Sequence, residues 1–262
     1  MDLLAGADAE IRHVGLHIVR VLAAFSVIPA FGTGPSTRFT KLGLGVYIGF
    51  AIAAARHDRA FVDPGPDALP LIGIMIREIL FGLLLGWVAR FWIEVVRGAG
   101  ALISHEMGLN MANQVDPATG IATPLVAHLY EIVALTLFFI MGAHHAVISS
   151  VVHSFDATPP GAFSPDADLL GSLTVFGGGL IEASLRVAAP VFVALVVLTV
   201  AVALLARVAP QWNILDASYP IRIGAGLSLL ILTLPVMRPV LDAVFEQSCR
   251  QLETVAMAGV GH

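Results

Sequence analysis

The chain has 262 residues, of which 57% are hydrophobic and only 13% are charged. Soluble domains average about 45 to 50% apolar and about 25% charged residues, so this composition and a mean hydropathy of +0.87 predict a membrane protein. The net charge of −5 offers no basic surface for nucleic-acid phosphates. The single cysteine, Cys249, excludes an internal disulfide. The first residues lack the basic region of a cleaved signal, so we expect the first apolar segment to be retained.

Six apolar segments follow one another, separated by stretches whose Gly and Pro residues interrupt helices. A segment of about 20 residues can cross a hydrocarbon core of about 30 Å. The predicted fold class is therefore all-α, an integral membrane protein of hydrophobic helical hairpins with broken helices. The expected segments are 14–31, 41–55, 71–104, 125–152, 169–206 and 220–245. Lysine and arginine are shared evenly between the two sides, which predicts no orientation.

Two of these segments contain features that bend a helix. The segment at 71–104 is too long for one straight crossing, and we expect it to protrude or to bend near Gly98 or Gly100. The segment at 169–206 contains the glycine run 177–179 and Pro190, either of which can bend a helix.

The junction between the third and fourth segments contains Asp116–Pro117, Thr119–Gly120 and Thr123–Pro124, which stop regular structure. It is therefore a non-helical loop. Met107 and Met111 lie four residues apart in it, and flexible thioethers suit a sealing surface, although core packing is their commoner use. Irregular backbone is tolerated in a membrane only where it contacts protein or lines a water-filled cavity. We therefore predict that the loop lies in or beside a pathway through an assembly.

Charged side chains also lie inside the apolar segments. Each costs about 2.5 to 3.5 kcal/mol at a bilayer centre, so it should face protein or water. Arg90 and Glu94 are four residues apart, as are Glu182 and Arg186, and we expect both pairs to form locally. Contacts between segments or between subunits are expected for Arg20, Arg77, Glu78 and Glu131.

Nine histidines raise the question of a metal site. No second histidine follows His105–Glu106 at the spacing of a zinc protease, and no triad of carboxylates accompanies the other histidines. The nucleophile elbow, the phosphate-binding loop and the dinucleotide glycine pattern are also missing from the sequence. We therefore predict no metal, no cofactor and no catalytic residue.

The stretch 77–86, REILFGLLLG, and the loop that follows it resemble the flagellar biosynthetic protein FliR family of type III secretion export gates (FliR/SctT). The resemblance extends to about Pro235, although the chain departs from the family pattern at His105–Glu106 and Met141. The further matches, in the order of the family, are Met107–Gly108, Asp116–Pro117, Gly120, Pro124, Phe138, Gly142–His145, Ser154–Phe155, Pro159–Gly161, Pro210–Gln211, Asn213, Tyr219–Pro220 and Gly226.

The resemblance implies a non-enzymatic, pore-forming subunit of the flagellar export gate, located in the bacterial inner membrane at the flagellar basal body. It implies FliP-like and FliQ-like subunits as partners in a hetero-oligomer, further membrane components of the export apparatus, and unfolded flagellar proteins as cargo. Within a single domain over 1–262, it implies a FliP-like portion at about 10–165 and a FliQ-like hairpin at about 166–250.

The resemblance also implies that the loop near 107–124 is a plug in the closed pore. The residues expected in the plug are Met107, Gly108, Met111, Asn113, Gln114, Asp116, Pro117, Gly120 and Pro124.

Three alternatives remain. The first is the homologous subunit of a virulence injectisome, which shares the architecture. The second is a small-solute secondary transporter with broken helices. The third, an intramembrane hydrolase, is disfavoured by the missing nucleophile and metal spacings.

Overall fold

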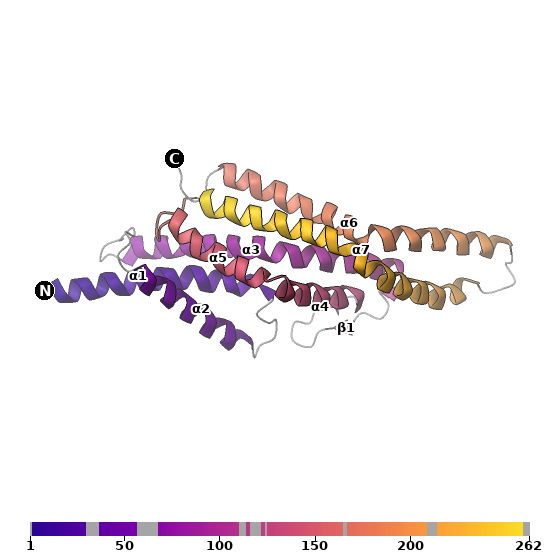
Figure 1. Cartoon of the computed structure of the whole chain (residues 1–262), viewed down its shortest axis with the longest axis horizontal. Coiled ribbons are helices and arrows are strands. Elements are labelled where there is room, and N and C mark those ends of the chain that lie inside the picture. Colours follow the sequence, from indigo (N-terminus) through magenta and orange to yellow (C-terminus); the bar gives the residue numbers. More distant parts are fainter. Residues whose placement is uncertain are drawn as a thin grey trace. The chain divides into compact units, whose positions relative to one another are not determined.

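The computed structural model describes residues 2–29, 37–56, 68–109, 114–115, 122–123, 125–164, 167–208 and 214–258 (Figure 1). Helices dominate these ranges, which confirms the predicted all-α class. The elements in chain order are α1 (Asp2–Val27), α2 (Thr37–Ala55), α3 (Ala68–Glu106), β1 (Gln114–Val115), β2 (Ala122–Thr123), α4 (Leu125–Ile140), α5 (Ala143–Ala157), α6 (Ala167–Val208) and α7 (Ile214–Ala258).

The chain forms two compact units, and α3, α4, α6 and α7 each contribute residues to both. Unit 1 consists of Met1–Phe91, Phe138–Phe176 and Gln247–His262. Unit 2 consists of Trp92–Leu137 and Gly177–Glu246. This division by contacts does not test similarity to other proteins, so the FliP-like and FliQ-like portions stay a prediction.

Three described helices are long and apolar enough to cross a membrane, namely Thr37–Ala55, Ala68–Glu106 and Gly171–Val208. The bent pair α4 and α5 makes a fourth candidate if it is one broken span. Of the six predicted apolar segments, those at 14–31 and 220–245 therefore contain no candidate span in the described part of the chain. Helix α1 is not among the candidate spans, and acidic, basic and histidine residues interrupt its apolar sequence. Helix α7 contains only the shorter apolar stretch Ser218–Thr233.

Helix α3 continues through Gly98 and Gly100, near which we expected it to protrude or to bend, so neither glycine ends it. In unit 2 these glycines instead allow neighbouring helices to approach. A Cβ atom at Gly98 would lie 2.7 Å from Oγ of Ser184 on α6, and one at Gly100 would lie 2.8 Å from Cα of Ala127 on α4. Helix α6 likewise continues through the glycine run and Pro190.

The segment expected at 125–152 is broken in the structure. Helix α4 ends at Ile140, α5 begins at Ala143, and the two are bent by 69°. Gly142 at the break has φ 70°, a left-handed conformation that glycine adopts without the steric penalty of a Cβ atom. The break agrees with the predicted broken helices, although the sequence analysis placed none at Gly142.

Glycines bring α2 close to α1 in unit 1. A Cβ atom at Gly45 would lie 2.5 Å from the Leu22 side chain, and one at Gly49 would lie 2.7 Å from Cα of Ile18. Rising numbers on α2 meet falling numbers on α1, so the two helices are antiparallel.

Helix α3 packs on α1 through a second pair of glycines. A Cβ atom at Gly82 would overlap the carbonyl oxygen of Arg20, and one at Gly86 would overlap that of Ala24. The numbers rise together, so α1 and α3 are parallel. The small-xxx-small spacing permits this backbone approach, as it does between helices in membranes.

We expect Gly82→Ala to destabilise unit 1 by about 1 to 3 kcal/mol, because the added methyl overpacks a backbone contact. Gly73→Ala on the same helix is the matched control, since no described atom lies within 4 Å of its Cβ position and the gain in helix propensity is the same. Thermal unfolding of the purified assembly measures both. Equal midpoints for the two variants contradict the close α1–α3 contact.

Candidate functional site

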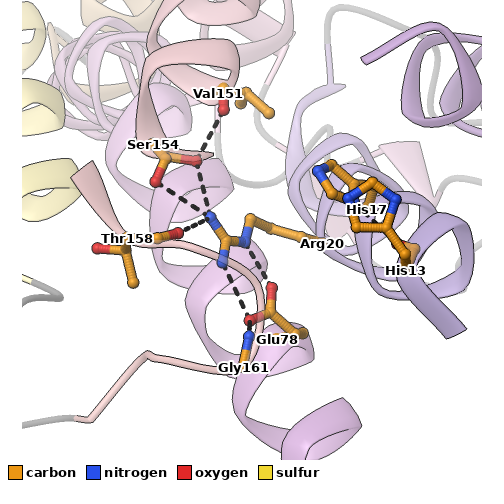
Figure 2. A network of polar contacts seen from close by, with 8 residues as sticks. All are labelled: His13, His17, Arg20, Glu78, Val151, Ser154, Thr158 and Gly161. Atoms are coloured by element: carbon orange, nitrogen blue, oxygen red, sulfur yellow. Dashed lines mark hydrogen bonds and ion pairs between the residues drawn. The ribbon is translucent and has the colours of Figure 1, made fainter. Parts of the chain in front are cut away.

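A buried ion pair joins α1 to α3 in unit 1 (Figure 2). Both side chains are fully buried. Nε of Arg20 donates to Oε2 of Glu78 at 2.5 Å, and Nη2 donates to Oε1 at 3.0 Å. This two-point geometry is the strongest form of an arginine–carboxylate contact, because both hydrogen bonds are charge-assisted.

The same ion pair holds the end of α5 and the turn that follows it (Figure 2). Nη1 of Arg20 donates to the carbonyl oxygens of Ser154 at 3.2 Å and Thr158 at 3.0 Å. The Ser154 carbonyl also accepts the N–H of Thr158 at 2.9 Å. Carbonyls at the end of a helix carry partial negative charge, so they suit a guanidinium. The backbone N–H of Gly161 donates to Oε1 of Glu78 at 2.9 Å.

Aromatic rings enclose the guanidinium. Its Cζ lies 4.7 Å from the Phe81 ring centroid and 4.2 Å from that of Phe155, within the range of cation–π attraction. His17, one turn before Arg20, stacks on Phe155 at 4.5 Å. Burial lowers the pKa of His17 to about 4, so the ring is neutral at pH 7 and adds no second positive charge. Helix α1, which carries His17, is not among the candidate spans.

Helices α1, α3 and α5 and the turn to Gly161 therefore converge on one pair of charges. The pair is closed to solvent and its polar atoms bind one another. Such a network holds elements together and leaves no group exposed for binding a substrate. Sequence reasoning did not predict the roles of Ser154, Thr158 and Gly161. The signal was present, because the motifs Ser154–Phe155 and Pro159–Gly161 contribute to this network.

The other charges singled out in the sequence have different surroundings. Glu131 on α4 lies 3.9 Å from Nε of Arg97 on α3, within unit 2. Glu182 and Arg186 pair locally at 2.5 Å, and both side chains are mostly exposed. Arg77 is exposed on α3. Their roles between subunits stay predictions.

At the end of α3, the two residues that begin the expected plug are described. Met107 is completely buried in unit 2, and its N–H donates to the carbonyl of Ile103 at 3.0 Å. Gly108 has φ 76°, and its N–H donates to the carbonyl of His105 at 3.0 Å. A glycine in the left-handed region just past a helix is a common helix end.

Two short strands draw the sides of the loop together. Strands β1 and β2 are antiparallel, with Gln114 opposite Thr123 and Val115 opposite Ala122. This pairing was not predicted. The remaining expected plug residues lie outside the described residues, namely Met111, Asn113, Asp116, Pro117, Gly120 and Pro124.

Histidine rings lie close together at two places. The centroids of His13 and His17 are 4.4 Å apart, and those of His144 and His145 are 4.0 Å apart. Within the described ranges, no three His, Cys, Asp or Glu side chains are grouped so that they could hold a metal ion.

The apolar helices, the broken pair α4–α5 and the buried charges define an all-α integral membrane protein. Residues 12–248 match the family described as bacterial export proteins, family 1, and the chain belongs to this family. It is 31% identical over 230 residues to the flagellar biosynthetic protein FliR of Escherichia coli (strain K12), a match that covers 88% of this chain and 87% of that protein.

Two further relatives bear on the choice between export systems. The chain is 26% identical over 253 residues to the flagellar biosynthetic protein FliR of Bacillus subtilis (strain 168), which covers 94% of this chain and 95% of the relative. It is also 26% identical over 207 residues to the surface presentation of antigens protein SpaR of Shigella flexneri, which covers 78% and 77%.

We expect Arg20→Met to destabilise the protein by about 3 to 5 kcal/mol, because the carboxylate of Glu78 remains buried without its cation. Arg20→Met combined with Glu78→Met removes both charges and should restore part of this loss. Arg186→Ala breaks an exposed pair and should cost only about 0 to 1 kcal/mol. Thermal unfolding of the purified assembly measures all three variants. A loss for Arg20→Met no larger than that for Arg186→Ala would show that the buried network is dispensable.

Proposed function

We propose that this chain is a structural, pore-forming subunit of the flagellar type III protein export gate. In this role it is needed for export of flagellar proteins and for assembly of the flagellum, and it catalyses no reaction. The observation that carries the proposal is the family match over residues 12–248, together with relatives named FliR that align over most of their own length.

The loop between α3 and α4 is proposed as the plug of the closed pore. The loop begins after Glu106, where α3 ends, and continues to Leu125, where α4 begins. Both helices are apolar. The pairing of β1 with β2 brings the outgoing and returning chains side by side. The pairing satisfies backbone hydrogen-bonding groups of residues 114–115 and 122–123. This property favours a position inside a membrane assembly.

The proposed partners are FliP-like and FliQ-like subunits in a hetero-oligomer of the inner membrane, at the flagellar basal body, with unfolded flagellar proteins as cargo. Exposed apolar side chains on α2, α3, α4, α6 and α7 support a large contact surface with protein or lipid. The exposed charges of Arg77, Glu182 and Arg186 on candidate spans favour protein or water over hydrocarbon at those positions.

The second candidate is the corresponding subunit of a virulence injectisome, and the match to SpaR supports it. Export assays separate the two systems. Restored swimming in a strain that lacks its own flagellar subunit supports the flagellar role, whereas restored needle secretion in an injectisome mutant supports the alternative.

We expect deletion of residues 115–122 to leave the assembly intact and to make the membrane leak small ions. The physical reason is that the deletion removes the tip of the stopper and leaves the helices that line the conduit. Potassium efflux from cells measures the leak, and copurification with the FliP-like and FliQ-like chains measures assembly. In a matched strain without the FliP-like subunit, the leak should vanish because no conduit forms. An assembled deletion variant with the efflux rate of the unaltered protein refutes the plug.

A further inference from the structure

Two motif residues of α7, Tyr219 and Gly226, have no part in the function proposed so far. Both lie in unit 2 against the end of α3. Farther along the same two helices, Nε1 of Trp92 donates to the carbonyl of Leu241 at 3.0 Å. The contacts of α3 with α7 thus run from Trp92 and Leu241 to Met107 and Gly226, so the helices are antiparallel in this unit.

Gly226 provides the space that the Met107 side chain occupies. A Cβ atom at position 226 would lie 2.7 Å from both Cγ and Sδ of Met107 and 2.8 Å from Cε. Real Cβ atoms do not approach other heavy atoms so closely, and Met107 is completely buried. The thioether therefore rests directly on the backbone of α7, and only glycine at 226 permits this.

Tyr219 covers the next residue of the loop. Its ring atoms Cδ1 and Cε1 lie 3.1 Å from the Cβ position of Gly108. Tyr219 precedes Gly226 by seven residues, which is about two helical turns, so both occupy one face of α7. The left-handed φ of 76° at position 108 also favours glycine there, because glycine has no Cβ atom. The geometry of the chain where it leaves α3 therefore depends both on the glycine at 108 and on the Tyr219 ring of α7.

We infer that Gly226 and Tyr219 are positioning residues that seat Met107 and Gly108 and so hold the root of the loop where it seals. This inference rests on the proposed plug function of that loop. Met107 acts here as a buried anchor, since no part of its side chain is exposed for a sealing surface. A shift of α7 along α3 would remove Met107 from its seat and release the loop.

The test is Gly226→Ala in the complete export gate, with potassium efflux as the readout. Overpacking of this kind lowers the ratio of seated to unseated Met107 by about 5- to 150-fold, and efflux should rise with the unseated fraction toward the level of the 115–122 deletion. Gly224→Ala is the matched control. It lies on the same helix with no described atom within 4 Å of its Cβ position, and efflux should not change.

A double-mutant cycle assigns the effect to the Met107 contact. In a Met107→Ala background the clash is absent, so Gly226→Ala should add no further leak. An equal increase in both backgrounds overturns the inference, because the effect then arises elsewhere. If Gly226→Ala fails to copurify with its partners, the comparison of Met107→Ala with Met107→Ala/Gly226→Ala still decides. A larger leak in the double variant than in Met107→Ala contradicts the proposed contact between Gly226 and Met107.

A crosslink tests the geometry without relying on the leak. Met107→Cys and Gly226→Cys, combined with Cys249→Ser, place two β-carbons within disulfide range, and oxidation should link them. Suppose that the 115–122 deletion leaks, that Gly226→Ala leaves efflux unchanged and that no crosslink forms. These results contradict the positioning role of Gly226 and remain consistent with the plug. A deletion that does not leak refutes the plug and, with it, the positioning role, even if the crosslink forms.

Discussion

The buried contact between Arg20 and Glu78 is the constraint on which unit 1 depends. Moving two charges out of water costs several kcal/mol for each ion, and their attraction offsets this cost only with close geometry and further hydrogen bonds. Here the further bonds come from the end of α5 and from Gly161. The network forms only when α1, α3 and the 154–161 stretch are all in place. It therefore specifies one arrangement of these elements.

Helix α3 connects this network to the loop. In unit 1 its glycines at 82 and 86 accept the backbone of α1, and Glu78 lies one turn before the first of them. In unit 2 its later residues contact α4, α6 and α7, and its end is seated at Gly226. The helix runs without a break from Ala68 to Glu106, so the residue that begins the loop directly follows the helix that carries the buried carboxylate.

The sequence allowed prediction of what depends on local composition. The apolar segments predicted the helices, and the dipeptides that stop regular structure predicted the loop. The cost of a charge in a membrane indicated that Arg20 contacts another segment or subunit. The identity of the partner, Glu78, depends on how α1 and α3 cross, which no local pattern encodes. Gly142 and Gly98 also look alike in the sequence. One breaks a helix by its left-handed φ and the other admits a neighbouring side chain, and only packing distinguishes them.

Cysteine chemistry along the loop tests its sealing role most directly. Single cysteines at Met111, Asn113 and Asp116, in a Cys249→Ser background, are introduced into the assembled gate at rest. If the loop is a stopper held against neighbouring chains, these cysteines crosslink to other subunits and react slowly with water-soluble thiol reagents. Free reaction with those reagents, with no crosslink to any other subunit, would contradict that role.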